Sequence, residues 1–115
     1  MGHAIKLNFG NYTLDAELYD TPIAEAFFRH LPLEIDLTQW GNELYGGIGA
    51  DLGEQAPTAS IAEGGLAYTN RGHLLCIFFG QAPAWPVESI GQIKDDQWQK
   101  LLENHPKDRV VVQSA

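Results

Sequence analysis

Cysteine, basic side chains and long apolar runs are scarce in this 115-residue chain, and each scarcity excludes a class of protein. A single cysteine, Cys76, cannot form an intrachain disulfide, so nothing indicates a disulfide-stabilised secreted domain. Seven basic against fifteen acidic side chains give a net charge of −8, which argues against nucleic acid or an anionic membrane surface as partner. The longest strongly apolar run, residues 74–79, is too short to cross a bilayer.

The N-terminus also lacks the basic segment and apolar core of a signal peptide, and we therefore expect a cytoplasmic protein. The four histidines are scattered, without a metal-binding spacing or a second cysteine, so the sequence predicts no metal site. Glycines at 47, 49 and 53 are spaced like a loose dinucleotide fingerprint, but Pro57 and small residues follow them instead of a helix. A flexible loop is the better interpretation, and we expect no cofactor.

What the chain does contain is a globular composition, with 44% apolar and 19% charged residues in the length of one domain, residues 1–115. Apolar and polar residues alternate on both sides of a Gly10-Asn11 break, which predicts two half-buried strands joined by a tight turn. Period two recurs in residues 33–38, and further short strands are predicted at 42–48, 65–69, 73–79, 87–93 and 109–113.

Two segments have a helical period instead. Thr21 is a good N-cap and Pro22 suits the first helical position, and an apolar stripe from Ile23 to Leu31 follows before Pro32. A second helix is predicted over residues 95–106, capped by Asp95 or Asp96. Clustered strands with only an early and a late helix indicate a mainly β fold, an antiparallel sheet or barrel with helices packed on it.

The segment "YTNRGHLLCIFFG", residues 68–80, brings Arg71, His73 and Cys76 close together in sequence. A turn predicted at "TNRG" places Arg71 at a loop tip. In the strand that follows, His73 and Cys76 point to opposite faces and lie roughly 10 Å apart, so they cannot form a catalytic pair within it. We interpret Cys76 as a small buried hydrophobe rather than a reactive thiol, and His73 as either a structural or a pocket residue.

Glu43 is the most interesting carboxylate, because Trp40 and Tyr45 surround it with aromatic surface. These residues either line a concave site that raises the pKa of the acid, or form a solvated strand edge with its aromatics in the core. Tyr68 and Trp85 are expected at strand or loop ends, where barrel pockets form. The candidate ligand-binding set is therefore Trp40, Glu43, Tyr45, Tyr68, Arg71, His73 and Trp85.

Several motifs together resemble cyclophilins, and more closely the small prokaryotic cyclophilin-like domains of unassigned function. "TPIAEAFFRHLP" resembles the first cyclophilin helix, while "LAYTNRGHLLCIFFG" and "LPLEIDLTQWGNELYGGI" are similar to segments of the prokaryotic domains. "SIGQIKDDQWQKLL" resembles the passage from a strand into the second helix. The resemblance implies a closed, mostly antiparallel β-barrel capped by two α-helices.

The resemblance does not extend to the catalytic motif of the isomerases. In those enzymes an arginine in a Phe-His-Arg strand hydrogen-bonds the twisting prolyl amide, whereas residues 36–47 here contain neither arginine nor histidine. Arg29 matches the helix arginine, and the Gly-Ser-Gln-Phe-Phe pattern is replaced by "GHLLCIFF". We expect a domain that binds a small molecule or short peptide in a barrel-face cleft; weak prolyl isomerisation, with Arg71 substituting, is the alternative. The sequence does not indicate an oligomeric state.

Overall fold

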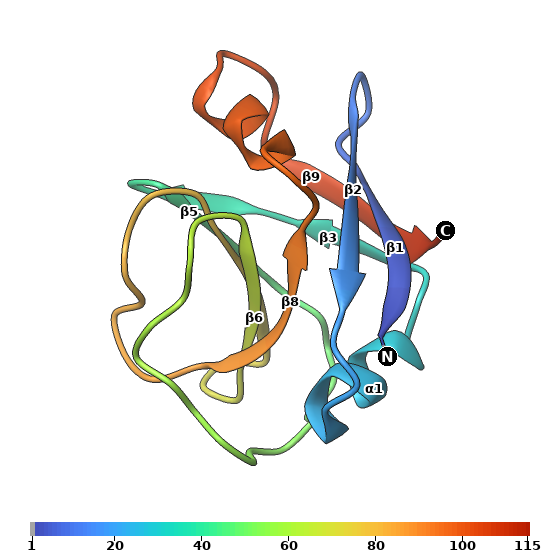
Figure 1. Ribbon diagram of the computed structural model, residues 1–115, viewed down its shortest axis with the longest axis vertical. Coiled ribbons are helices and arrows are strands. Elements are labelled where there is room, and N and C mark those ends of the chain that lie inside the picture. Colours follow the sequence, from blue (N-terminus) through green and yellow to red (C-terminus); the bar gives the residue numbers. More distant parts are fainter. Residues whose placement is uncertain (1) are drawn as a thin grey trace.

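Nine strands form one antiparallel sheet in the computed structural model, which describes residues 2–115. The strands are β1 (His3–Asn8), β2 (Thr13–Leu18), β3 (Leu33–Asp36), β4 (Thr38–Trp40), β5 (Glu43–Gly47), β6 (Gly65–Thr69), β7 (Leu74–Phe78), β8 (Glu88–Ile93) and β9 (Arg109–Ser114). Their order in the sheet is β3-β9-β1-β2-β8-β6-β7-β5-β4. The sheet curls around a common core into a nearly closed barrel (Figure 1).

The predicted N-terminal hairpin is confirmed in register as well as in position. Leu7 lies opposite Leu14 and Ile5 opposite Ala16. All four side chains are buried, because alternate residues of both strands face the same core. Gly10 adopts a positive φ of 107° in the turn, a conformation that glycine reaches without steric cost.

A close approach of β3 to β5 brings the two ends of the sheet together. A Cβ on Gly46 would lie 2.2 Å from the backbone oxygen of Asp36 and 2.5 Å from Ile35 Cγ2. Only a residue without a side chain permits this contact. Leu37 interrupts the strand predicted over 33–38 and separates β3 from β4. As a result, β4 pairs with the edge of β5 that does not pair with β7.

The two predicted helices differ in how closely the structure matches the prediction. Helix α1 (Pro22–Phe28) begins as expected, with the Thr21 hydroxyl accepting a hydrogen bond from the backbone N–H of Ala24 and Pro22 in the first turn. The second is a six-residue 3₁₀-helix, η1 (Gln97–Leu102), and the Asp96 side chain forms no cap hydrogen bond. The two lie at opposite ends of the barrel (Figure 1), so the cap of two α-helices expected from the resemblance is reduced to one short α-helix and one 3₁₀ turn.

The strands β5, β6 and β7 are covered on both faces. Their inward residues Leu44, Leu66, Leu75 and Ile77 join the main core, together with the aliphatic side chains of β1, β2, β8 and β9. Their outward residues Ala67, Cys76 and Phe78 form a second apolar cluster with Val87. This outer cluster is the foundation of the pocket described below. No helix within residues 2–115 is long and apolar enough to span a membrane.

Candidate functional site

A pocket of about 310 Å³ opens on the outer face of the β4-β5-β7-β6 part of the sheet. Its walls are mostly apolar, with one carboxyl group among them. It is lined by Trp40, Glu43, Tyr45, Thr69, Leu74, Cys76, Phe78, Pro83, Ala84, Trp85 and Val87. Four of the seven residues expected from the sequence, Trp40, Glu43, Tyr45 and Trp85, therefore lie together.

Strand register arranges the pocket floor in three rows. In the first row Trp40 lies opposite Glu43, and Glu43 opposite Phe78. In the second, Cys76 lies between Tyr45 and Ala67. In the third, Leu74 lies between Gly47 and Thr69. Because directly opposed residues of antiparallel strands share a face, all three rows face outward.

Glu43 is the buried polar group of the first row, with only 7% of its surface exposed. Burial raises the pKa of its carboxyl group, while hydrogen bonds from the Cys76 thiol and the Gln81 side chain oppose that rise. The side-chain oxygen of Gln81 accepts the backbone N–H of Asn42 at 2.8 Å, which leaves the amide NH₂ of Gln81 to face the carboxylate. Glu43 is thus held in place by two donors.

Cys76 is buried, as the sequence predicts, with 3% exposure and no disulfide partner. Burial and the neighbouring Glu43 raise the pKa of the thiol far above its ordinary value of 9.0. A thiol that stays protonated at neutral pH is a poor nucleophile. Cys76 therefore contributes a hydrogen-bond donor and a wall to the pocket, and no reactive thiolate.

The opposite end of the pocket is organised by the Thr69 hydroxyl group. Its oxygen accepts the indole N–H of Trp85 at 2.9 Å and the backbone N–H of Arg71 at 3.1 Å. The Arg71 guanidinium lies over the Trp85 ring, with its carbon 4.4 Å from the ring centroid. This cation–π contact holds an exposed positive charge against Trp85, which is one of the residues that line the pocket.

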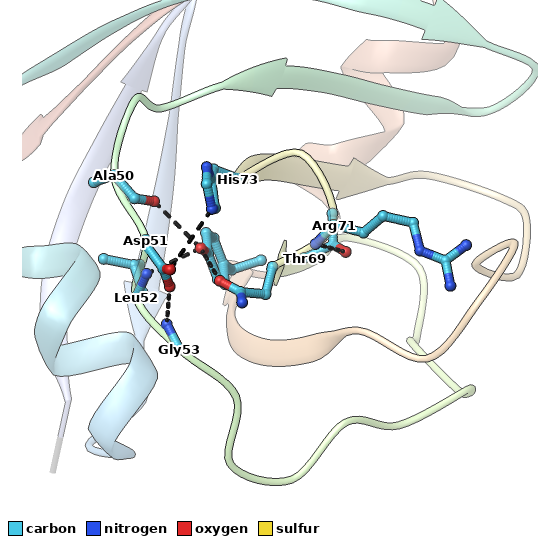
Figure 2. A network of polar contacts seen from close by, with 9 residues as sticks. Ala50, Asp51, Leu52, Gly53, Thr69, Arg71 and His73 are labelled. Carbon is cyan, nitrogen blue, oxygen red and sulfur yellow. Dashed lines mark hydrogen bonds and ion pairs between the residues drawn. The ribbon is translucent and has the colours of Figure 1, made fainter.

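Neither Tyr68 nor His73 lines the pocket. Both contact the loop that contains Ala50, Asp51 and Leu52, which Figure 2 shows beside His73. Tyr68 is fully buried and belongs to the main core. Its hydroxyl donates to Ala50 O or Asn70 Oδ1, at 3.2 and 2.7 Å, and accepts the backbone N–H of Leu52 at 3.0 Å. It fixes the loop that follows β5, on the opposite side of the sheet from the pocket.

His73 departs from its expected place in a strand. It precedes β7 with a positive φ of 56°, and its Nε2 lies 3.9 Å from Asp51 Oδ2. The Arg71 side chain extends away from this network while the His73 ring leans over it (Figure 2). Arg71 and His73 are therefore close in sequence but contact different regions, Trp85 of the pocket and Asp51 of the loop after β5.

Glu88 is a second buried carboxylate and has a different environment from Glu43. It is 5% exposed, and its oxygens accept the backbone N–H groups of Gln55 and Ala56 at 2.9 to 3.2 Å. These bonds tie the loop 54–58 to the barrel, so Glu88 has a structural role. Glu43, by contrast, faces the pocket.

The sequence interpretation missed Thr69 and Gln81, and it did not connect Cys76 with Glu43. The signal for Cys76 was its alternation with Leu74 and Phe78 on one face of β7. Only the pairing of β5 with β7 shows that this is the face of Glu43 and Tyr45. No group of three or more His, Cys, Asp or Glu side chains within residues 2–115 is arranged to hold a metal ion.

The arrangement suits binding of a compact apolar group. Aromatic side chains form the walls, and the carboxylate of Glu43 can accept a hydrogen bond at one end while Arg71 can meet a negative charge at the other. Among the residues of the range 2–115 that line the pocket, Cys76 is a poor nucleophile, because the raised pKa of its thiol keeps it protonated.

Three solved structures share this fold. A hypothetical protein from Archaeoglobus fulgidus, known from its solution structure, is 24% identical with a TM-score of 0.79, over 99% of this chain and 95% of that protein. McbB, solved in complex with tryptophan, is 17% identical with a TM-score of 0.72, over 96% of this chain but 44% of McbB. A cyclophilin-type peptidyl-prolyl cis-trans isomerase from Cryptosporidium parvum is 17% identical with a TM-score of 0.62, over 99% and 96%.

At these identities the likeness concerns the fold alone. No protein of curated function matches the chain. The family model described as Cyclophilin-like matches residues 3–113, which is nearly the whole sequence and agrees with the resemblance seen in its motifs. The chain therefore belongs to the Cyclophilin-like family.

Proposed function

We propose that this chain is a binding domain whose outer-face pocket takes a small molecule or the side chain of a short peptide. The observation that carries the proposal is a 310 Å³ pocket with aromatic walls and a buried carboxyl group at one end. Its volume is at the lower end of the roughly 300 to 1,000 Å³ typical of small-molecule sites. McbB, which shares the fold, has been solved with bound tryptophan, so small aromatic compounds are the first to test.

Intrinsic fluorescence offers a direct assay, because two of the three tryptophans, Trp40 and Trp85, line the pocket. Trp98 packs instead against the main core, and a Trp98→Phe background removes its signal. A fragment collection is screened against this variant, and hits are confirmed by calorimetry on the unaltered chain. We expect aromatic hits that change the fluorescence of Trp40 and Trp85.

Two variants assign the hits to the pocket. Trp40→Ala removes a wall and Glu43→Gln removes the charge, so either should weaken binding about tenfold or more. Leu102→Ala is the matched control, because Leu102 is an exposed apolar residue of η1 outside the pocket. Hits that bind Trp40→Ala and Glu43→Gln as they bind the unaltered chain would show that this pocket is not the site.

Prolyl isomerisation is the second candidate, favoured by the fold shared with a cyclophilin-type isomerase and by Arg71, which stacks on the pocket residue Trp85. Against it, the lining formed by residues 2–115 contains no arginine, and the Arg71 guanidinium is stacked on Trp85. A protease-coupled proline isomerisation assay at micromolar protein should give the buffer rate. A faster rate that Arg71→Ala abolishes would favour the enzyme instead.

The proposed role is compatible with the cytoplasmic location expected from the sequence, which stays a prediction.

A further inference from the structure

The two ends of the pocket have opposite electrostatic character. Glu43 belongs to the first row of the floor, opposite Phe78, and Thr69 to the third, opposite Leu74. Leu74 and Phe78 are four residues apart in an extended strand, so these rows are separated by roughly 13 Å. The pocket is therefore an apolar slot with one polar group at each end.

At the first end, Glu43 keeps unused hydrogen-bond acceptor capacity. An ionised carboxylate has about four lone-pair sites. The Cys76 thiol and the Gln81 amide occupy two of them from within the protein. The remaining sites belong to a carboxylate that lines the pocket, and a bound N–H donor can satisfy them.

At the second end, Arg71 keeps unused donor capacity. Its guanidinium stacks on Trp85, and none of the ion pairs among residues 2–115 includes it. Stacking orients the guanidinium and leaves its edge N–H groups free for a ligand. In a chain with a net charge of −8, this exposed cation beside an apolar pocket is an attractive site for an anion.

We propose that the ligand is a planar, mainly apolar carboxylic acid with an N–H donor at the end remote from its carboxylate. The N–H group binds Glu43, the planar body lies between the aromatic walls, and the carboxylate meets Arg71. This inference rests on the proposed function of the pocket and specifies the ligand class that it takes.

A series of indoles tests the two ends separately on the intact chain. Indole-3-propionate carries both groups, 1-methylindole-3-propionate lacks the N–H donor, and 3-propylindole lacks the carboxylate. Because hydrogen bonds to charged groups are stronger than those between neutral groups, indole-3-propionate should bind tighter than either analogue by about tenfold or more, measured by calorimetry at pH 8.

Variants assign each preference to its residue. Arg71→Gln should reduce the affinity for indole-3-propionate to that for 3-propylindole and leave 3-propylindole unchanged, whereas Arg29→Gln at the C-cap of α1 should alter neither. In Glu43→Leu, methylation of the indole nitrogen should no longer reduce affinity. Should this variant fail to fold, the comparison of the two propionates on the unaltered chain still tests the same contact.

Equal affinity for the three indoles would overturn this inference while the pocket remained a binding site. The same holds if fragments of another chemical class bind there and the indoles do not. Failure of every fragment and every indole to bind would overturn the proposed function as well.

Discussion

The residues on the inner face of β5, β6 and β7 have a different role from those on the outer face. Inward, Leu44, Leu66 and Ile77 pack in the main core, and Tyr68 is held there by hydrogen bonds at its hydroxyl group. Outward, the same strands present three polar residues to a partly open pocket. Cys76 donates a hydrogen bond to Glu43, and Thr69 accepts one from Trp85. One face is filled by the chain itself, and the other leaves space.

The difference teaches that burial alone does not separate structural from functional residues. Tyr68, Cys76 and Glu43 are all buried, yet only the latter two line a space that a ligand can enter. The comparison predicts that inner-face substitutions reduce the free energy of unfolding, and that outer-face substitutions change binding or pH dependence instead.

The largest expected effect on stability comes from neighbouring glycines of β5. A methyl group at Gly46 would lie 2.2 Å from Asp36 O, whereas one at Gly47 would meet no atom within 4 Å. Gly46→Ala should therefore force β3 and β5 apart and lower the free energy of unfolding by about 3 kcal/mol or more. Gly47→Ala is the matched control, with a change of about 0.5 kcal/mol or less in urea unfolding. Equal effects of the two substitutions would contradict the close approach of β3 to β5.

A second, smaller effect is expected from the two tyrosines. Tyr68→Phe removes a hydroxyl group that accepts from Leu52 and donates into the loop, so it should cost about 1 to 3 kcal/mol. Tyr45→Phe keeps the ring of a half-buried pocket residue and should leave thermal stability nearly unchanged. The comparison would be reversed if Tyr45→Phe were the more destabilising change.

Glu43 predicts an effect that depends on pH. Its pKa is raised above the ordinary value of 4.5 in the folded chain, so the folded state binds this proton more tightly than the unfolded state does. The resulting stabilisation is fully present below pH 4.5 and is lost as the pH rises through the folded-state pKa. Glu43→Gln does not titrate, so its melting temperature relative to the unaltered chain should increase as the pH is raised from about 4 to 8.

Glu63→Gln, at an exposed loop position, is the control for this experiment and should follow the unaltered chain. A difference between Glu43→Gln and the unaltered chain that is constant with pH would mean that Glu43 is not desolvated in the folded state.

A small change in stability is also expected at Trp40. More than half of this residue, 52%, is exposed, so Trp40→Ala should lower the free energy of unfolding by only about 1 kcal/mol. Its effect on ligand affinity, set out above, should be larger. A loss of stability greater than that of Tyr68→Phe would place Trp40 with the structural residues.

Local patterns in the sequence were sufficient for most elements. The alternation around Gly10 predicted β1 and β2, and Thr21 with Pro22 predicted the start of α1, because strand faces and helix caps depend on residues close in sequence. The second helix was less well predicted: it shortened to a 3₁₀ turn after Asp95, whose positive φ of 53° breaks the expected helix start.

Part of the candidate site could also be predicted from local patterns in the sequence. Trp40, Glu43 and Tyr45 are close in sequence, and their grouping needed only the pattern of one hairpin. Tyr68 was expected at a pocket but faces the core, because a strand covered on both sides carries apolar residues at every position and its pattern does not distinguish its two faces.

The sequence by itself determined that this chain forms a mainly β fold with an acidic surface, a buried lone cysteine and a carboxylate among aromatics. Tertiary structure alone decided that Glu43 meets Cys76, that Thr69 holds Trp85 beneath Arg71, and that Gly46 lets β3 approach β5. These contacts depend on the register between strands distant in sequence, and register is set by how the whole sheet buries one face against its core.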